Sequence, residues 1–86
     1  MQDKRAESIR EFDLRKLKFP IIVIYRHPKD YPDKYAARVF DITRPTEAVI
    51  VKGTLQELQK DIAWNTDKSF LPADEKDDPN IVGSWI

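Results

Sequence analysis

Pro20-Ile21-Ile22-Val23-Ile24-Tyr25 is apolar at consecutive positions, with no polar residue between them. Successive residues of a strand point to opposite faces of a sheet, so a strand made of these residues needs cover on both faces. The chain contains one clearly signalled helix, which begins at Thr54 and can supply one cover. We expect the second cover to be the N-terminal segment, a second copy of the chain or a partner.

The segments around this stretch predict a small antiparallel meander. Residues 19–26 form the first strand, and a loop rich in Pro and Asp follows over residues 27–33. Residues 35–42 and 47–52 are rich in Val, Ile and aromatic side chains and are separated by a turn over residues 43–46. Because both connections are short, the three strands are expected to pair in sequence order.

Thr54-Leu55-Gln56-Glu57 matches the capping box that starts many helices. In such a box, the Thr54 hydroxyl accepts from the amide three residues on, and Glu57 reaches back to the Thr54 amide. Leucine and isoleucine then recur at helical spacing up to residue 64. A polar connection over residues 66–80 leads to a last strand over residues 81–86.

The expected fold is therefore α+β, with the order (α)βββαβ and a four-stranded, mainly antiparallel sheet. The helix over residues 54–64 covers one face, and the N-terminal segment or a partner covers the other. Residues 1–86 form a single domain, in which residues 1–17 are an N-terminal helix or a loosely ordered arm. The expected core consists of Ile21, Val23, Ile24, Val39, Phe40, Val49, Val51, Leu55, Leu58, Ile62, Val82 and Trp85.

Composition narrows the class of protein. The chain has no cysteine, which fits a reducing cytoplasm, and it has no apolar run of the ~20 residues that a membrane-spanning helix needs. Its 15 basic and 15 acidic residues cancel, but residues 1–44 carry 11 basic and 7 acidic residues whereas residues 45–86 carry 4 and 8. This polarity either favours head-to-tail self-association or is ordinary surface variation. A nucleic-acid-binding domain usually has a net positive charge, and this chain does not.

Candidate catalytic and metal-binding residues are few. His27 is the only histidine, with Asp30 and Asp33 near it in sequence, and Asp41 and Glu47 flank a turn. The acidic stretch over residues 74–80 lacks the glycine and the terminal glutamate of an EF-hand loop. We therefore interpret His27 as a surface residue and the acidic stretch as a solvated loop. We predict no enzyme activity, cofactor, metal or small-molecule ligand.

An interaction surface has more support, because aromatic and arginine side chains gather on the first two strands and their connections. Such side chains are typical of protein hot spots and of single-stranded nucleic-acid binding sites. In the alternative interpretation, the tyrosines pack against the edge of the sheet and the arginines are solvated. Trp64, near the helix end, either closes the core or acts as a docking anchor. The candidate surface consists of Tyr25, Arg26, Tyr31, Tyr35, Arg38, Arg44 and Trp64.

The meander followed by Gly53-Thr54-Leu55-Gln56-Glu57-Leu58 resembles the N-terminal domain of HicB-type antitoxins over residues 20–64. In that family three strands run into a Thr-Leu-x-Glu helix that is followed by another strand. The resemblance implies toxin neutralisation and operator binding. The chain also resembles small proteins of bacteria and their phages.

Together these observations predict a non-enzymatic, cytoplasmic module that binds a protein partner or forms a homodimer. The alternative is a small nucleic-acid-binding or antitoxin-like regulatory domain.

Overall fold

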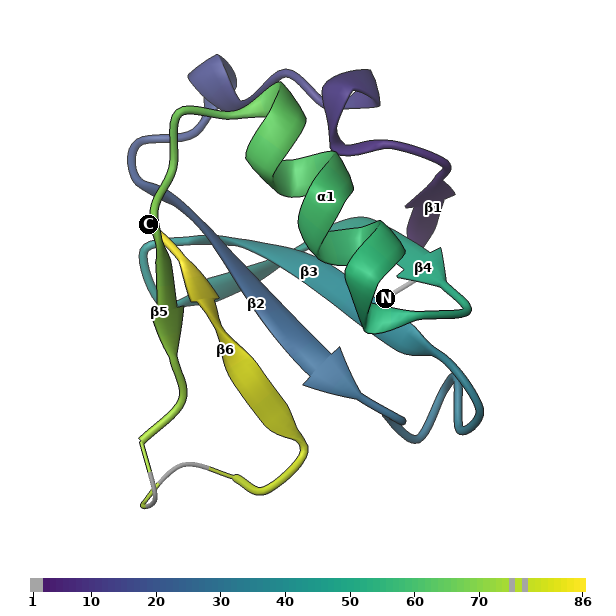
Figure 1. Ribbon diagram of the computed structural model, residues 1–86. Coiled ribbons are helices and arrows are strands. Elements are labelled where there is room, and N and C mark those ends of the chain that lie inside the picture. The colour runs from purple at the N-terminus through teal and green to yellow at the C-terminus, as the bar shows by residue number, and fades with distance from the viewer. Residues whose placement is uncertain (1–2, 75, 77) are drawn as a thin grey trace.

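The computed structural model describes residues 3–74, 76 and 78–86. These residues form one six-stranded sheet, in the order β1-β4-β3-β2-β6-β5, with one α-helix across one of its faces (Figure 1). The strands are β1 (Lys4–Ala6), β2 (Pro20–Arg26), β3 (Tyr35–Asp41), β4 (Arg44–Lys52), β5 (Phe70–Pro72) and β6 (Ile81–Trp85). The helices are α1 (Leu55–Asn65) and two short 3₁₀ turns, η1 (Ile9–Glu11) and η2 (Leu14–Lys16).

The α+β class with a single α-helix agrees with the prediction, but the four-stranded sheet is wrong. The meander β2-β3-β4 forms the centre, and β6 pairs antiparallel with β2. Two strands of three residues each complete the sheet: β5 pairs antiparallel with β6, and β1 pairs parallel with β4. The sheet is therefore mixed. Strands this short carry no periodic signal in the sequence, because alternation needs four or more residues to be recognised.

The N-terminal segment does not take the position expected of it. Only residues 4–6 join the sheet, and η1 and η2 lie beside α1, on the same face (Figure 1). Asp61 of α1 holds this segment: its carboxylate accepts from the Ser8 hydroxyl at 2.6 Å and from the Ile9 amide at 2.8 Å. The predicted N-terminal helix is replaced by two separately capped turns. Ser8 and Glu11 form a capping box at the first, and Asp13 caps the second.

Helix α1 begins where the sequence predicts, with Thr54 as its N-cap. The Thr54 hydroxyl accepts from the Glu57 amide at 3.2 Å, as in a capping box. The second bond differs from the expectation, because the Glu57 carboxylate accepts from the Thr54 hydroxyl at 2.9 Å instead of from the Thr54 amide. The helix ends at Asn65, where Thr66 returns to extended backbone.

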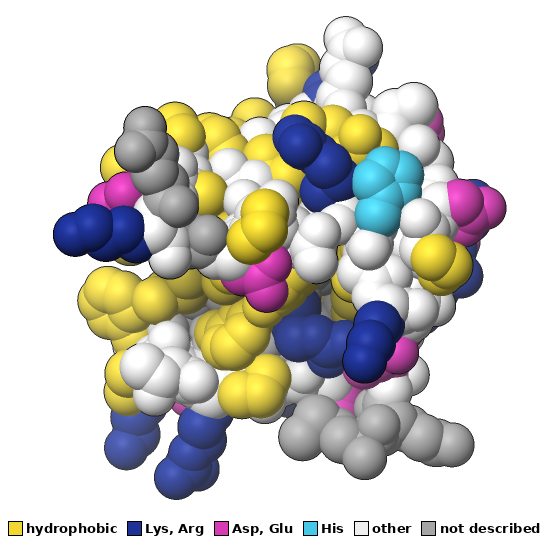
Figure 2. All heavy atoms as spheres, turned by 90° about the horizontal axis from the view of Figure 1, so that it is seen from below, with side chains coloured by type: hydrophobic (Ala, Val, Ile, Leu, Met, Phe, Trp, Pro, Cys, Tyr) yellow, Lys and Arg dark blue, Asp and Glu magenta, His cyan; other side chains and the backbone are white. Residues whose placement is uncertain are grey.

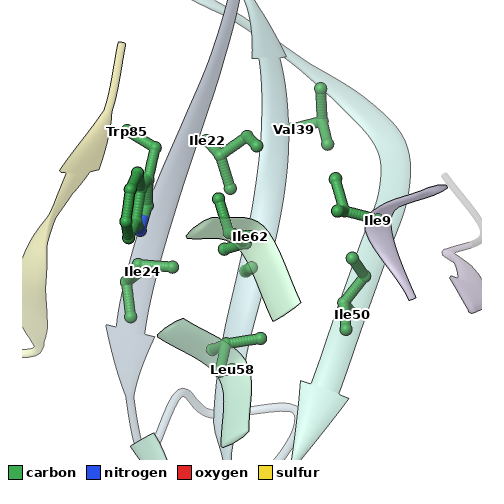
Figure 3. Close-up of a cluster of buried hydrophobic side chains, with 9 residues drawn as sticks. Ile9, Ile22, Ile24, Val39, Ile50, Leu58, Ile62 and Trp85 are labelled. Carbon is green, nitrogen blue, oxygen red and sulfur yellow. The ribbon is translucent and has the colours of Figure 1, made fainter. Parts of the chain in front are cut away.

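The main core lies between the sheet and the layer formed by α1 and η1. Figure 3 shows side chains from β2, β3 and β4 pointing toward Leu58 and Ile62 of the helix, with Ile9 of η1 closing one side. Several predicted core residues are only half-buried: Ile21, Val23, Phe40, Leu55 and Val82. Several buried residues were not predicted: Ile9, Ile22, Ala36, Ala37 and Ile50. On β2 the error is one of alternation, because a run that is apolar throughout does not indicate which residues face the helix.

The last strand, β6, packs closely against β5 at Gly83. Trp85 is 8% exposed, its ring lies 5.3 Å from that of Phe70, and its indole N–H donates to Gln59 of α1 at 2.7 Å. A Cβ atom on Gly83 would lie 2.5 Å from the Phe70 ring and from the Leu71 carbonyl oxygen. Gly83 therefore leaves room for a neighbouring ring, and that ring belongs to Phe70.

Candidate interaction face

The face of the sheet turned away from α1 carries the candidate site, and we call it the open face. The strand registers place one row of residues across all six strands, from Leu71 on β5 through Val23 and Arg38 to Arg5 on β1. Neighbouring rows pair Ile21 with Phe40, and Tyr25 with Ala36 and Ile81. The open face consists of Arg5, Ile21, Val23, Tyr25, Ala36, Arg38, Phe40, Val49, Val51, Leu71, Ile81 and Ser84.

The β4 side of the open face is covered by the chain itself. Residues 27–34 fold back as a loop, closed by backbone hydrogen bonds from the His27 amide to the Lys34 carbonyl oxygen and from the Lys34 amide to the Tyr31 carbonyl oxygen. The Tyr31 ring packs on a small apolar cluster of Ala36, Val49 and Val51. This loop therefore covers β3 and β4 on the open face, and the second cover expected for Ile21 and Val23 of β2 is not supplied by it.

An ion pair ties the N-terminal residues to the same side. One Arg38 guanidinium nitrogen lies 2.9 Å from an Asp3 carboxylate oxygen, and the two side chains are only 20% and 21% exposed. Asp3 also accepts from the Tyr31 hydroxyl at 3.3 Å, and the Arg5 guanidinium lies 5.6 Å from the centre of the Tyr31 ring. Arg38 makes its remaining bond to the Thr46 carbonyl oxygen at 3.2 Å. Its charge is thereby neutralised within the protein.

The other side of the open face lacks such a cover. Ile21, Val23 and Phe40 are half-buried, and Leu71 on β5 and Phe19 just before β2 are each 53% exposed. Figure 2 shows hydrophobic side chains gathered in a band across this side of the molecule, with Lys and Arg side chains beside them. An apolar area of this kind on a folded domain marks a contact surface more often than a scatter of single residues does.

Ile42 adds a strained residue to this end of the sheet. It has φ = 62° in the two-residue turn between β3 and β4, is 53% exposed and donates its amide to the Phe19 carbonyl oxygen at 2.9 Å. Left-handed backbone is unfavourable for a β-branched side chain, and glycine is the usual residue at such a turn position. The protein thus has a large apolar side chain at a turn position where the backbone conformation favours glycine.

Between the covered and uncovered parts lies a hollow of about 190 Å³, lined by Tyr25, Pro28, Asp30, Tyr31, Ala36, Arg38 and Val49. Burial raises the pKa of the Tyr25 phenol above its ordinary value of 10.0, while Arg38 opposes the shift and Asp78 adds to it. Burial also raises the pKa of Tyr31, and the charge and the hydrogen bond of Asp3 add to that shift. Both phenols therefore stay protonated and can donate hydrogen bonds at neutral pH.

The structure brings together three of the seven candidate residues, Tyr25, Tyr31 and Arg38. Tyr35 packs with the main core on the opposite face and meets the His27 ring at 5.2 Å. Arg26 is exposed at the end of β2, and Arg44 is exposed beside the turn between β3 and β4. The remaining residue, Trp64, does not close the core. It is 84% exposed on α1, beside a groove of about 540 Å³ that Lys52, Lys60 and Asp61 also line.

The candidate catalytic and metal-binding residues are engaged elsewhere. His27 is exposed, with φ = 49°, and its Nδ1 lies 2.8 Å from the Pro32 carbonyl oxygen, so this nitrogen carries the proton. Asp41 accepts from the Phe19 amide, and Glu47 lies 3.9 Å from the Lys4 ammonium. Among the described residues, no three His, Asp or Glu side chains are placed to hold a metal ion. Glu75 and Asp77 of the acidic stretch lie outside the described residues.

Four residues at this face were not singled out from the sequence: Asp3, Phe19, Ile42 and Leu71. Two of them carried a usable signal. Phe19 continues the alternation of Ile21, Val23 and Tyr25, and Leu71 is an apolar residue within a stretch otherwise interpreted as a polar connection. The positions of Asp3 and Ile42 depend on the pairing of β1 and on the turn type, which the sequence does not show.

No helix in the described part of the chain is both long and apolar enough to cross a membrane. No protein-family model, curated protein or solved structure matches the chain. The resemblance to HicB-type antitoxins, with a toxin as the implied protein partner, therefore stays a prediction.

Proposed function

We propose that this protein is a non-enzymatic module that binds another polypeptide through the uncovered part of the open face. The observation that carries the proposal is the apolar surface formed by Ile21, Val23, Phe40 and Leu71, with Phe19 at its border. The burial of apolar surface stabilises a complex by ~25 cal/mol for each Å² and is the main favourable term in protein association. A folded partner or an extended segment gains this term on contact with the face.

The charges support a protein partner more than a nucleic acid. Nucleic-acid affinity comes mainly from cationic side chains that neutralise phosphates. On the open face Arg38 is already paired with Asp3, and Arg5 lies over the Tyr31 ring. The other candidate arginines, Arg26 and Arg44, lie at the ends of different strands and not in one track.

The proposed compartment is the cytoplasm, since a chain without cysteine needs no oxidising environment to fold.

The chemistry of the described residues also favours binding over catalysis. A hydrolytic or acid–base site needs a nucleophile, a base and a group that stabilises the transition state, all within hydrogen-bond reach. The hollow beside the open face holds two protonated phenols, an arginine whose charge is already paired and the carboxylate of Asp30. These groups can fix the orientation of a side chain inserted from a partner.

Photo-crosslinking tests the proposal directly. A photo-reactive phenylalanine in place of Leu71 lies on the open face, and the same residue in place of Lys16, which is exposed on η2 beside α1, is the matched control. Irradiation of cells that express each variant is expected to give a discrete adduct from position 71 and none from position 16. Absence of any adduct from position 71, or equal adducts from both positions, would refute the proposal.

A further inference from the structure

We infer that the occupant of the open face is a second copy of this chain, and that the two sheets stack face to face about a two-fold axis. This inference rests on the proposed function and names the partner. Its first support is the amount of surface that the single chain exposes, which is 6056 Å². Folded monomers of 10.1 kDa expose about 5,300 Å² by the scaling of surface with mass. The chain therefore exposes more surface than a typical monomer of its mass, and a standard-size interface buries ~800 Å² of each partner.

The second support is the shape and chemistry of the face. Two sheets pack about 10 Å apart when the side chains of their facing surfaces are apolar and interdigitate. Val23 lies near the middle of the sheet, and the row through it ends at Leu71 on the β5 edge. The two-fold contact of a homodimer uses the same patch on both copies, so an apolar surface without unpaired charge is self-complementary.

The third support is electrostatic. The chain has 15 basic and 15 acidic residues, so two copies approach without net repulsion. Arg38 is the charged residue nearest the middle of the open face, and its ion pair with Asp3 spares the interface an unpaired buried charge. The dimer would have four layers, with α1 of each copy on the outside and the two sheets in the middle.

Ile42 and Phe19 fit this arrangement. Both are 53% exposed at the end of the sheet where the face is uncovered, and Ile42 keeps left-handed backbone in a turn that favours glycine. Strained residues persist where the surrounding structure or a function retains them. Burial against the second copy explains why a large apolar side chain occupies this position.

Sedimentation velocity of the purified full chain over a range of concentrations tests the inference. The wild type is expected to sediment as a dimer. Leu71→Lys and Phe19→Lys, both at exposed positions, are each expected to raise the dimer dissociation constant at least about tenfold, because they place charge in the interface. Trp64→Lys changes the most exposed large apolar residue on α1 and is expected to leave the constant unchanged. Circular dichroism of each variant confirms that it is folded.

The outcomes separate this inference from the proposed function. A wild-type dimer that Leu71→Lys weakens and Trp64→Lys does not supports the second copy. A chain that stays monomeric at every concentration, or a dimer that only Trp64→Lys weakens, overturns it. If the monomeric chain still forms a discrete adduct with a different polypeptide from position 71, the protein-binding proposal stands without the homodimer. If it forms none, both fail.

Discussion

Asp3 and Arg38 form an ion pair at 2.9 Å across two strands that are not neighbours in the sheet, because the carboxylate precedes β1 and the guanidinium comes from β3. The pair fixes the N-terminal residues against the open face and removes a positive charge from the middle of that face. It also separates the covered part of the face, under Tyr31, from the uncovered part around Val23.

Replacing the carboxylate of this pair tests its contribution to stability. Asp3→Asn leaves the Arg38 guanidinium partly buried without its counter-ion, and we expect unfolding in urea to show a loss of about 1–3 kcal/mol. Glu47→Gln is the matched control, because Glu47 and Lys4 are 3.9 Å apart and well exposed, so its effect should stay within about 0.5 kcal/mol. Equal effects of the two substitutions would contradict the role given to Asp3.

The two glycines differ in the space around them. Gly83→Ala places a methyl group against the Phe70 ring and the Leu71 carbonyl oxygen, and overpacking of this kind costs about 1–3 kcal/mol. Gly53→Ala has no atom within 4 Å of the new methyl group and does not have left-handed backbone, so we expect it to be neutral or slightly stabilising. Thermal unfolding of both variants measures the contrast, and a Gly83→Ala variant as stable as the wild type would disprove the close packing of β5 on β6.

Ile9 is the fully buried side chain that the described N-terminal segment contributes to the core, and Phe12, Leu14 and Leu17 pack against this core while partly exposed. Ile9 is 1% exposed between α1 and the sheet, so Ile9→Ala should cost about 2–4 kcal/mol of unfolding free energy. Leu71→Ala, at a position that is 53% exposed, is the control and should cost much less in the monomer. A small loss for Ile9→Ala would show that residues 7–18 are not docked on α1. For the same reason, removal of residues 1–17 is expected to unfold the protein.

Alkaline pH should destabilise the fold through its tyrosines. Burial raises the pKa of Tyr25 and Tyr31, so the folded state keeps both protons at a pH at which the unfolded chain loses them. Their stabilising contribution is fully present below the unfolded pKa of about 10 and is lost as the pH rises through the folded pKa values. Urea midpoints measured from neutral to strongly alkaline pH should fall, and they should fall less steeply in Tyr25→Phe. An identical slope in that variant would remove the link to Tyr25.

Nucleic-acid binding, the alternative to protein binding, has its own test. The zero net charge and the scattered arginines lead us to expect no saturable binding of single- or double-stranded probes at low salt. Fluorescence anisotropy with labelled probes measures this. Binding that weakens steeply with added salt and is reduced by Arg26→Ala would instead favour the alternative.

The central elements were predictable because each carries a strong local signal. The apolar run of β2, the loop before β3 and the cap at Thr54 indicate the meander and the helix correctly. The turn expected over residues 43–46 is shorter than predicted, because β4 begins at Arg44. What failed depends on contacts distant in sequence. The pairing of β1 with β4 and the docking of Ser8 on Asp61 join residues more than 40 positions apart. The capping box at Ser8 and Glu11 was present in the sequence but marks a single turn rather than a helix.

For the candidate face, the sequence indicated the two-sided character of β2 and the residues Tyr25, Tyr31 and Arg38. It did not show which face of the sheet α1 covers. A shift of one residue in register would turn Ile21 and Val23 toward α1 in place of Ile22 and Ile24. It also did not place Trp64, whose position near the helix end is compatible with either face. Its exposure follows from the rotation of α1, which the spacing of Leu58 and Ile62 sets.

The most direct test of the face-to-face dimer is an isotope-filtered nuclear Overhauser experiment on a mixture of labelled and unlabelled chains. This measurement detects only contacts between different copies. The account predicts contacts from the methyl groups of Val23 and Leu71 of one copy to the open face of the other, and none from Trp64. Intermolecular contacts confined to the α1 side, or no intermolecular contacts at concentrations where the methyl groups of Val23 and Leu71 are well resolved, would contradict it.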